Sequence, residues 1–315
     1  MDMKIFHFET IKKQNILPQT CVEWVREAFR LKYLSQLPAK ISMKIDEKIF
    51  FNTMPVYLPD LNRFGVKVVS RYPEREPALQ ADILLFDTQT GETLALMDGS
   101  WITAMRTGAV AALAIKELKS STAREYAFLG LGNTARATLL CLLSFLHEPI
   151  HIRLLAYKGQ EQLFIERFAA YESVRFSVYD LVEDLIDGAD VVVSCVTVAT
   201  ELFAPDRVFK EGVLVVPVHT RGFQNCDLFF DKVFADDTNH VKDFKYFSQF
   251  KAYDEFSQIL LGENPGRESD KERILAYNIG IALHDVYFAA KLFELLEAHP
   301  DFQIQTSSNL AKYWV

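Results

Sequence analysis

The sequence predicts an α/β protein in which a doubly wound domain with a parallel sheet is inserted into a mixed α+β domain. Between about residues 125 and 218, short apolar runs alternate with amphipathic helical segments, which is typical of a parallel sheet covered by helices. Strand-like segments before residue 100 lack this rhythm, and a long amphipathic helix follows after it has ended. A chain of 315 residues is also long enough for two cores.

The first part of the chain predicts a helix followed by a mixed or antiparallel sheet. The helix spans residues 18–34 and begins at Pro18, which suits a first helical turn. Residues 49–58 and 65–70 are rich in β-branched and aromatic side chains and predict strands. Residues 82–87 and 93–97 flank Thr88-Gln-Thr-Gly91, a turn signal that predicts a hairpin.

Residues 102–118 predict an alanine-rich helix, after which strands and helices alternate. The predicted strands are 126–129, 150–156, 174–178, 189–196 and 213–218, and the predicted helices are 134–146 and 160–171. The last two strands are almost entirely apolar, as expected for parallel strands that are buried on both faces. A helix over 279–296 is assigned to the first domain. The predicted domains are therefore 1–119 plus 280–315, for substrate binding and dimerisation, and 120–279.

Composition excludes several classes of protein. The net charge of −8 and the absence of a Lys/Arg run argue against nucleic-acid binding, which needs a concentrated basic face. The longest apolar stretches fall far short of the roughly 20 residues that a membrane-spanning helix needs. The N-terminus lacks the apolar core of a signal peptide, and four scattered cysteines form no metal-binding or disulfide pattern. A cytoplasmic protein without a metal site is expected.

A glycine-rich turn is the main binding motif. Gly130-Leu-Gly132-Asn-Thr-Ala135 follows a predicted strand and opens a predicted helix. The first glycine permits a tight turn, the second lets backbone N–H groups approach a pyrophosphate, and Ala135 permits close packing of helix and strand. This context predicts a Rossmann-type domain that binds NAD or NADP; the alternative is a tight turn without a ligand. The predicted cofactor-binding residues here are Gly130, Gly132, Asn133, Thr134 and Ala135.

Two further strand ends complete the predicted cofactor site. The second strand of the inserted domain ends without a carboxylate for the adenosine ribose, and Lys158 stands beside that position. A basic residue there favours NADP, although Lys158 as a solvated loop charge is the alternative. Ser194-Cys-Val196-Thr197 ends another parallel strand, so Ser194, Val196 and Thr197 are expected beneath the dinucleotide, with Cys195 as a small buried side chain.

Three regions resemble the ornithine cyclodeaminase/mu-crystallin family. They are the stretch from Asp98 to Val110 with its Arg-Thr-Gly-Ala sequence, Phe64-Gly-Val-Lys-Val-Val-Ser70 followed by Pro73, and Glu263-Asn-Pro-Gly-Arg267 with Gly280 and Asp285 in the C-terminal segment. The resemblance implies a homodimer formed by the first domain and an NAD or NADP site in the inserted domain, with Thr107 among the cofactor-binding residues.

The resemblance also implies roles for four basic or titratable residues. Arg106 resembles the arginine that binds the substrate carboxylate, because a guanidinium offers two parallel donors. Lys67 resembles the lysine that contacts this carboxylate and assists proton transfer. Lys40 occupies the place of a further family arginine, although the match could shift to Lys44. His219 stands where cyclodeaminases carry an aspartate, either as a general base or as a side chain that only lines the nicotinamide site.

Three functions follow from the resemblance. The first is NAD(P)-dependent hydride transfer at the α-carbon of an amino acid or its imine, as in an imine or ketimine reductase or an amino-acid dehydrogenase. The second is an ornithine cyclodeaminase, a lyase that converts L-ornithine to L-proline and ammonia; His219 in place of the aspartate counts against it. The third is a non-catalytic NADPH- and ligand-binding protein of mu-crystallin type. A small amino or imino acid is the expected partner of the first two.

Overall fold

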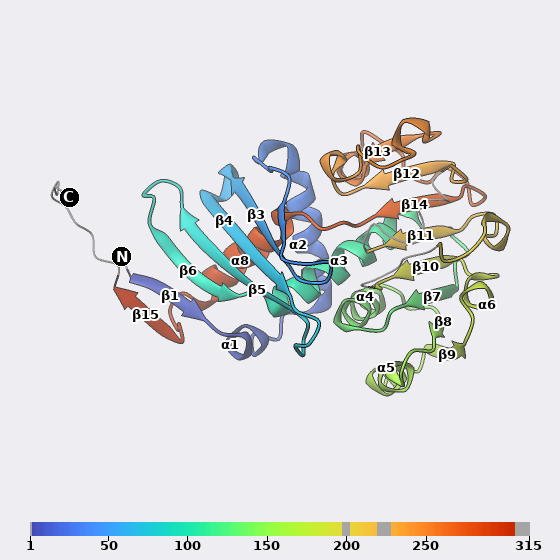
Figure 1. Cartoon of the computed structure of the whole chain (residues 1–315), viewed down its shortest axis with the longest axis horizontal. Helices are drawn as coiled ribbons and strands as arrows, with labels where there is room; N and C mark the ends of the chain where they lie inside the picture. Colours follow the sequence, from blue (N-terminus) through green and yellow to red (C-terminus); the bar gives the residue numbers. More distant parts are fainter. Residues whose placement is uncertain (1, 197–201, 219–227, 306–315) are drawn as a thin grey trace. The chain divides into compact units, whose positions relative to one another are not determined.

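The computed structural model describes residues 2–196, 202–218 and 228–305, which form two compact units (Figure 1). The first unit comprises Met1–Ile16, Leu31–Thr103 and Ala282–Val315. The second unit comprises Leu17–Arg30 and Ala104–Ile281. Each unit is therefore discontinuous in the sequence.

The first unit is built on a mixed sheet. Its described strands lie in the order β15-β1-β6-β5-β4-β3-β2, and neighbours are antiparallel except for the parallel pair β1 and β6. The strands are β1 (Asp2–Phe6), β2 (Ile41–Lys44), β3 (Phe50–Leu58), β4 (Arg63–Arg71), β5 (Leu79–Asp87), β6 (Thr93–Asp98) and β15 (Phe302–Gln305), and a short helix α1 (Phe8–Lys12) follows β1. The predicted mixed sheet and its hairpin are confirmed.

One long helix covers this sheet. Helix α8 (Ala282–Leu296) packs against β3, β4 and β5, and most of its side chains are buried. In β3 the residues that face the helix are Met54, Val56 and Leu58, which alternate with partly exposed residues as a two-residue period requires. Burial of an apolar helix on one face of the sheet forms the core of the first unit.

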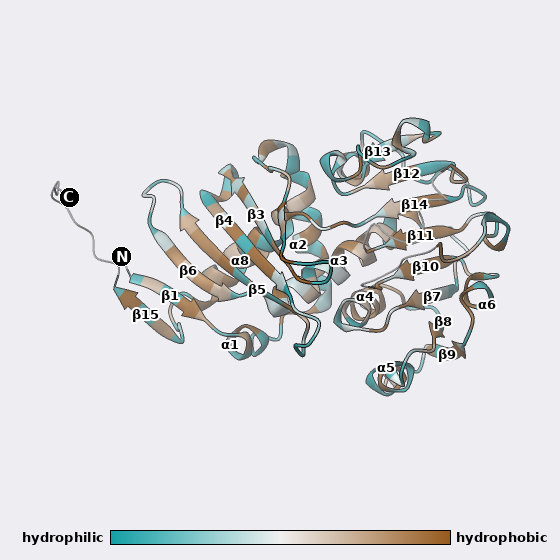
Figure 2. Ribbon diagram, in the orientation of Figure 1, coloured by the Kyte–Doolittle hydropathy of each residue, from teal (hydrophilic) through white to brown (hydrophobic). Residues whose placement is uncertain are grey.

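The second unit is built on a parallel sheet. Its described strands lie in the order β13-β12-β14-β11-β10-β7-β8-β9, and all paired neighbours are parallel. The central strands are almost wholly apolar, as the brown colour of β10 and β11 in Figure 2 shows. The strands are β7 (Glu125–Leu129), β8 (Ile150–Leu155), β9 (Val174–Tyr179), β10 (Val191–Ser194), β11 (Leu214–Pro217), β12 (Lys232–Ala235), β13 (Tyr253–Glu255) and β14 (Ile274–Tyr277).

The helices of the second unit include both predicted connections of its first strands. Helix α4 (Asn133–Leu143) follows β7 and α5 (Gln160–Phe168) follows β8. The remaining helices are α2 (Pro18–Arg30), α3 (Ser100–Leu118, of which Ala104 onward belongs to this unit), α6 (Val182–Ile186) and α7 (Phe256–Leu261). The alternation of strand and helix confirms the predicted α/β fold with a doubly wound parallel sheet.

The compact units differ from the predicted domains in two segments. Helix α2 and most of α3 were assigned to the first domain, whereas both group with the second unit. Helix α2 packs on α4 and α7, with the rings of Phe29 and Phe256 5.3 Å apart. Arg26 of α2 also donates a hydrogen bond of 2.7 Å to Glu117 of α3. The helix predicted to start at residue 279 begins at Ala282, and the parallel sheet continues through β14 before it.

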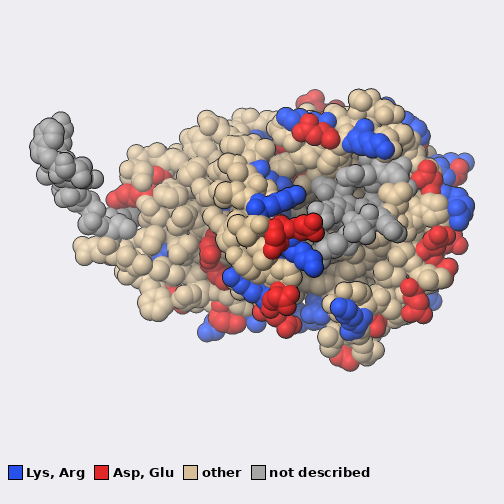
Figure 3. Space-filling view, viewed as in Figure 1, with Lys and Arg blue, Asp and Glu red and all other residues tan. Residues whose placement is uncertain are grey.

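Three general features of the described residues concern membranes, metal ions and surface charge. None of the helices within the described ranges is long and apolar enough to cross a membrane. Over the described parts of the chain, no cluster of three or more His, Cys, Asp or Glu side chains is placed to hold a metal ion. On the face shown in Figure 3, Lys and Arg side chains are interspersed with Asp and Glu.

Candidate active site

The glycine-rich turn lies where the strand order of the parallel sheet reverses. Strand β7 is flanked by β8 on one side and β10 on the other, so the chain leaves β7 at a topological switch point. Gly130 has a φ of +78°, and a Cβ atom there would lie 2.8 Å from the carbonyl carbon of Cys195. Only glycine fits this position, because both the backbone angle and the neighbouring strand end exclude a side chain.

The second glycine leaves the start of α4 open. Gly132 is the N-cap residue, no side chain caps the helix, and a Cβ at Gly132 would meet nothing within 4 Å. Gly132 and Asn133 are exposed, Thr134 is half-buried and Ala135 is fully buried. A helix N-terminus with uncapped N–H groups on an open turn fits the pyrophosphate of a dinucleotide.

The Arg-Thr-Gly-Ala segment has a packing role besides any role in binding. A Cβ at Gly108 would lie 2.5 Å from the carbonyl carbon of Ala137, so this glycine lets α3 and α4 pack closely. Thr107 precedes it and is half-buried. The glycine of the motif therefore fixes the position of α4, whose first turn carries the candidate phosphate site.

The end of β10 lies beside the turn. The backbone N–H of Cys195 donates a hydrogen bond of 2.7 Å to the carbonyl of Leu129, and Ser194 is fully buried. Val196 follows and is half-buried, whereas Thr197 lies outside the described residues. Burial raises the pKa of the Cys195 thiol to about 12, so the thiol stays protonated at neutral pH and is no nucleophile.

The end of β8 carries a lysine and no carboxylate. Lys158 is exposed, has a left-handed φ of +52°, and places its Nζ 5.2 Å from the ring centroid of Tyr157. The nearby Glu161 accepts a hydrogen bond of 2.9 Å from the backbone N–H of Tyr157. Backbone donation by Tyr157 contributes most to holding the pKa of Glu161 below its usual value. The Glu161 carboxylate is thus engaged with the backbone at this strand end.

Arg106 is buried in the second unit against a glycine. It lies in α3 with 5% of its surface exposed, and a Cβ at Gly280 would be 2.9 Å from its Nη1. Gly280 has a φ of +89°, and its N–H donates a hydrogen bond of 2.6 Å to the buried Asp236. Asp236 was not predicted. Its sequence signal is a carboxylate directly after a short apolar strand.

Lys67 is buried in the first unit against an acidic residue. It lies on β4 with 1% exposure, and its Nζ donates a hydrogen bond of 2.9 Å to Asp285 of α8, which is fully buried. The pairing was not predicted, although Asp285 belongs to a region that suggested the family. A carboxylate among the apolar residues of the first turn of a predominantly apolar helix is the signal that could have identified it.

Lys40 or Lys44 was expected in the place of a further family arginine near the substrate, and the register of the first sheet favours Lys40. Ile41 pairs with Thr53 and the next residue of β3, Met54, pairs with Lys67. Lys40 directly precedes Ile41, so along the chain it lies nearer to this row than Lys44 does. Lys44 instead pairs with Phe50, at the other end of the strand. His219, the fourth predicted substrate-site residue, lies outside the described residues.

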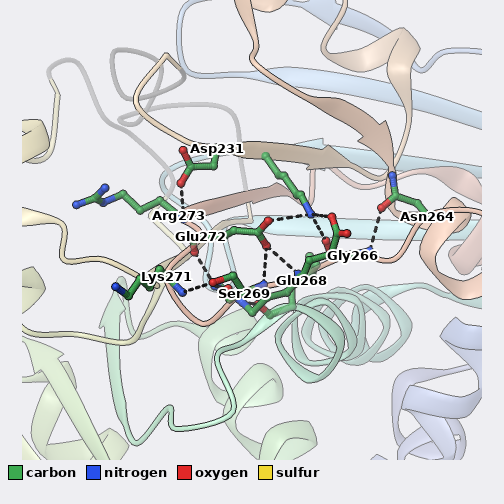
Figure 4. Close-up of polar contacts among 11 residues, drawn as sticks. Asp231, Asn264, Gly266, Glu268, Ser269, Lys271, Glu272 and Arg273 are labelled. Atoms are coloured by element: carbon green, nitrogen blue, oxygen red, sulfur yellow. Dashed lines mark hydrogen bonds and ion pairs between the residues drawn. The ribbon is translucent and has the colours of Figure 1, made fainter.

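The third region that suggested the family lies at the amino ends of β11 and β14, and Figure 4 shows polar contacts made there. Arg267 donates hydrogen bonds to carbonyls that precede three strands, those of Leu118, Gly212 and Glu272. Lys232 of β12 binds the carbonyl of Gly266 and the carboxylates of Glu268 and Glu272. The glycine-rich turn follows the carboxyl end of β7. This network joins segments at the amino ends of the strands and therefore lies apart from the turn.

The chain is similar in sequence to several known proteins. The ornithine cyclodeaminase/mu-crystallin family matches residues 2–299. Nodulation efficiency protein NfeD of Rhizobium meliloti is 27% identical over 271 residues, which are 82% of this chain and 84% of the relative. A Δ1-pyrroline-2-carboxylate reductase of Bacillus cereus is 28% identical over 263 residues, 76% of this chain and 80% of the relative.

The fold has also been seen in a solved structure. Thermococcus litoralis Δ1-pyrroline-2-carboxylate reductase, in complex with NADH and L-proline, superposes with a TM-score of 0.84 at 24% identity. The match covers 94% of this chain and 98% of that structure, and at this identity it concerns the fold. The family match spans nearly the whole sequence and includes the glycine-rich turn, Lys67 and Arg106. The chain belongs to the ornithine cyclodeaminase/mu-crystallin family.

Proposed function

We propose that this protein is an NAD(P)H-dependent imine reductase that acts on a cyclic α-imino acid such as Δ1-pyrroline-2-carboxylate. The observation that carries the proposal is the burial of two cationic side chains, Arg106 and Lys67, at positions where the sequence resembles the family's substrate-binding residues. Guanidinium and ammonium groups form strong charge-assisted hydrogen bonds with carboxylates, and the α-carboxylate of an imino acid is such a ligand. The named activity of the Bacillus cereus relative supports the same substrate class.

The residues have distinct chemical tasks in this proposal. Reduction adds a hydride to the α-carbon of the C=N bond and a proton to its nitrogen, giving a cyclic secondary amine. The hydride is the chemistry that the reduced nicotinamide supplies when it is bound. Arg106 binds the substrate carboxylate through paired N–H donors, and Lys67 contributes a second cation and assists proton transfer. The first turn of α4, from Asn133 to Ala135, holds the pyrophosphate.

A direct assay tests this function. The purified protein is mixed with NADPH or NADH and Δ1-pyrroline-2-carboxylate or its six-membered homologue, and loss of reduced cofactor is followed together with chiral product analysis. We expect oxidation of the cofactor with formation of L-proline or its homologue. No oxidation with any cyclic or linear imino acid would contradict the proposal and favour the ligand-binding function of mu-crystallin type.

Cyclodeamination of L-ornithine is the second candidate. It needs a group that holds the departing amine, and His219 replaces the family aspartate, so a fixed negative charge is missing at that position. Incubation with L-ornithine and a trace of NAD⁺ separates the two functions by mass spectrometry. Proline and ammonia without net cofactor reduction would establish the lyase and contradict the reductase proposal.

The end of β8 supports a preference for NADPH over NADH. Lys158 is exposed beside this strand end, and a 2′-phosphate would find a cation there where an NAD enzyme offers a carboxylate to the ribose. We expect Lys158→Glu to lower kcat/KM for NADPH about 10-fold or more while kcat/KM for NADH changes little. Lys271→Glu makes the same charge change at the amino edge of the same sheet and serves as the control. An equal loss for both cofactors would argue against this role.

We also propose a homodimer formed by the first unit, as the family resemblance implies. Sedimentation velocity of the purified protein tests this directly. A single species at the mass of two chains is expected, and a monomer at micromolar concentration would contradict it.

A further inference from the structure

Lys67 occupies a position that normally belongs to the core. On β4 the residues that face α8 are Gly65, Lys67 and Val69, and all three are buried, whereas Val68 on the other face is 36% exposed. Lysine is almost never fully buried unless it is paired. The side chain of Lys67 therefore depends on what α8 presents to it.

The close approach of α8 to β4 is built into the sequence. A Cβ atom at Gly65 would lie 2.6 Å from both γ-carbons of Val286, so only glycine lets the first turn of α8 lie this close to the strand. Asp285 precedes Val286 in that turn and reaches Lys67, with 2.9 Å between Oδ1 and Nζ. Gly65 and Lys67 are two residues apart on one face, so the same approach brings the two charged groups together.

This pair is a poor way to stabilise a core. Removing both charges from water costs several kcal/mol for each ion, and an apolar pair of similar volume is often as stable or more stable. Elsewhere on α8 the side chains of Leu283, Val286 and Phe288 are fully buried and apolar, and His284 is a second buried polar residue beside Asp285. A role outside folding is therefore needed to account for the Asp285 carboxylate.

We infer that Asp285 is a positioning residue that fixes the Lys67 ammonium for the substrate, an inference that rests on the proposed function. A lysine ammonium is a point charge on a flexible four-carbon stem, so its location is set by its partners. The hydrogen bond to Asp285 holds Nζ in one place within a buried site. Asp285 thus acts on the reaction through Lys67.

A double-mutant cycle tests this role with the full chain saturated with NADPH. The variants are Asp285→Asn, Lys67→Met and the two combined. The measurements are kcat and KM for the imino acid, and the Kd of pyrrole-2-carboxylate, a planar analogue that reports on binding when turnover is lost. We expect Asp285→Asn to lower kcat/KM about 10- to 100-fold and to weaken analogue binding, because small displacements of a catalytic group have effects of this size. In the Lys67→Met background the same change should have little further effect.

Two further variants separate positioning from folding. Asp285→Glu keeps the charge one methylene further from the backbone, so we expect part of the kcat/KM to be recovered; it also provides the comparison with wild type if Asp285→Asn does not fold. Asp301→Asn is the matched control. Asp301 accepts hydrogen bonds from the His7 N–H at 2.7 Å and the Thr10 hydroxyl at 2.6 Å in the same unit, so its loss should lower only the unfolding midpoint.

The outcomes are distinct. Wild-type kcat/KM in Asp285→Asn, or an equal loss of analogue affinity with and without Lys67, would overturn the positioning role while leaving the proposed function intact. If Asp285→Asn does not fold, wild-type kcat/KM in Asp285→Glu would overturn the positioning role. If the wild-type protein neither reduces an imino acid nor binds pyrrole-2-carboxylate, the proposed function fails and this inference fails with it.

Discussion

Arg106 shows how a glycine can set the position of a functional side chain. Its Nη1 lies 2.9 Å from where a Cβ of Gly280 would be, and Gly280 has a φ of +89°. Gly280→Ala should therefore displace the guanidinium and strain the backbone by about 1 to 3 kcal/mol. We expect KM for the imino acid to rise about 10-fold or more, with the Kd for NADPH unchanged, as measured by steady-state kinetics and fluorescence titration.

A second glycine serves as a control that separates backbone strain from displacement of the Arg106 guanidinium. Gly91 has a similar φ of +76°, but a Cβ there would meet nothing within 4 Å. Gly91→Ala should lower stability to a similar extent and leave KM unchanged. If both variants raise KM alike, backbone strain and not the contact with Arg106 accounts for the effect.

The sequence led to Lys67 and Arg106 because both lie in continuous family-like segments, but it did not lead to their surroundings. Asp285 is 218 residues from Lys67 along the chain, and Gly280 is likewise far from Arg106 in the sequence. Such partners are determined by which strand and helix pack together, and no local pattern encodes that. Lys40 illustrates the converse. Two registers were open in the sequence, and the pairing of β2, β3 and β4 favours Lys40 over Lys44.

Arg267 links the end of α3 to the segments that lead into β11 and β14. It donates to the carbonyls of Leu118, Gly212 and Glu272, and burial lowers the pKa of its guanidinium, although Glu272 and Asp270 oppose this shift. Arg267→Met removes these bonds and leaves carbonyls unpaired, so we expect a loss on the order of 3 kcal/mol in the free energy of unfolding. Denaturant unfolding measures it. Activity of the folded fraction should be unchanged, because this network lies at the edge of the sheet opposite the glycine-rich turn.

The control is an arginine in a solvent-exposed pair. Arg207 contacts Glu183 at 3.5 Å with side-chain exposures of 76% and 54%. Arg207→Met should change stability by less than about 0.5 kcal/mol. A loss of kcat/KM in Arg267→Met without a loss of stability would show that the segment takes part in catalysis.

Elements with a strong pattern were predictable, and short or non-local ones were not. Strands β7 to β11 and helices α3 and α4 were predicted because apolar runs or helical periodicity mark them. Strands β12 and β14 have four residues each and were missed, which placed the end of the parallel sheet too early. Strands β1 and β15 pair from opposite ends of the chain, so no local pattern indicates their pairing. Strand β2 is exposed throughout and therefore lacks the apolar alternation that marks a strand.

Acidic residues outnumber basic ones in this molecule, by 42 Asp and Glu to 34 Lys and Arg, and several are stabilised in the charged form. Burial opposes ionisation of Asp190, but backbone N–H groups of Arg124 and Glu125 and the Lys210 ammonium outweigh it and hold its pKa below the usual value. Asp231 and Glu272 have lowered pKa values through similar bonds. The unfolded chain therefore binds more protons at acidic pH, and these groups lose their contribution to stability as pH falls below about 5.

The pKa of one carboxylate is shifted in the opposite direction. Burial raises the pKa of Asp82, and so does the charge of Asp98, which lies directly across the β5–β6 pair. The folded state holds its proton more tightly than the unfolded state does, so Asp82 favours folding more as pH falls. Asp82 and Asp190 thus form a matched pair of test positions with opposite expected behaviour.

Urea unfolding of Asp190→Asn and Asp82→Asn between pH 7 and pH 3 tests the argument for the whole chain. At pH 7, Asp190→Asn should be less stable than wild type and Asp82→Asn more stable. Both differences should shrink toward zero as pH falls, because the wild-type carboxyls then become neutral like the amides. Differences that stay constant over this range would mean that the lost hydrogen bonds or altered packing, and not the charges, determine the stability at these positions.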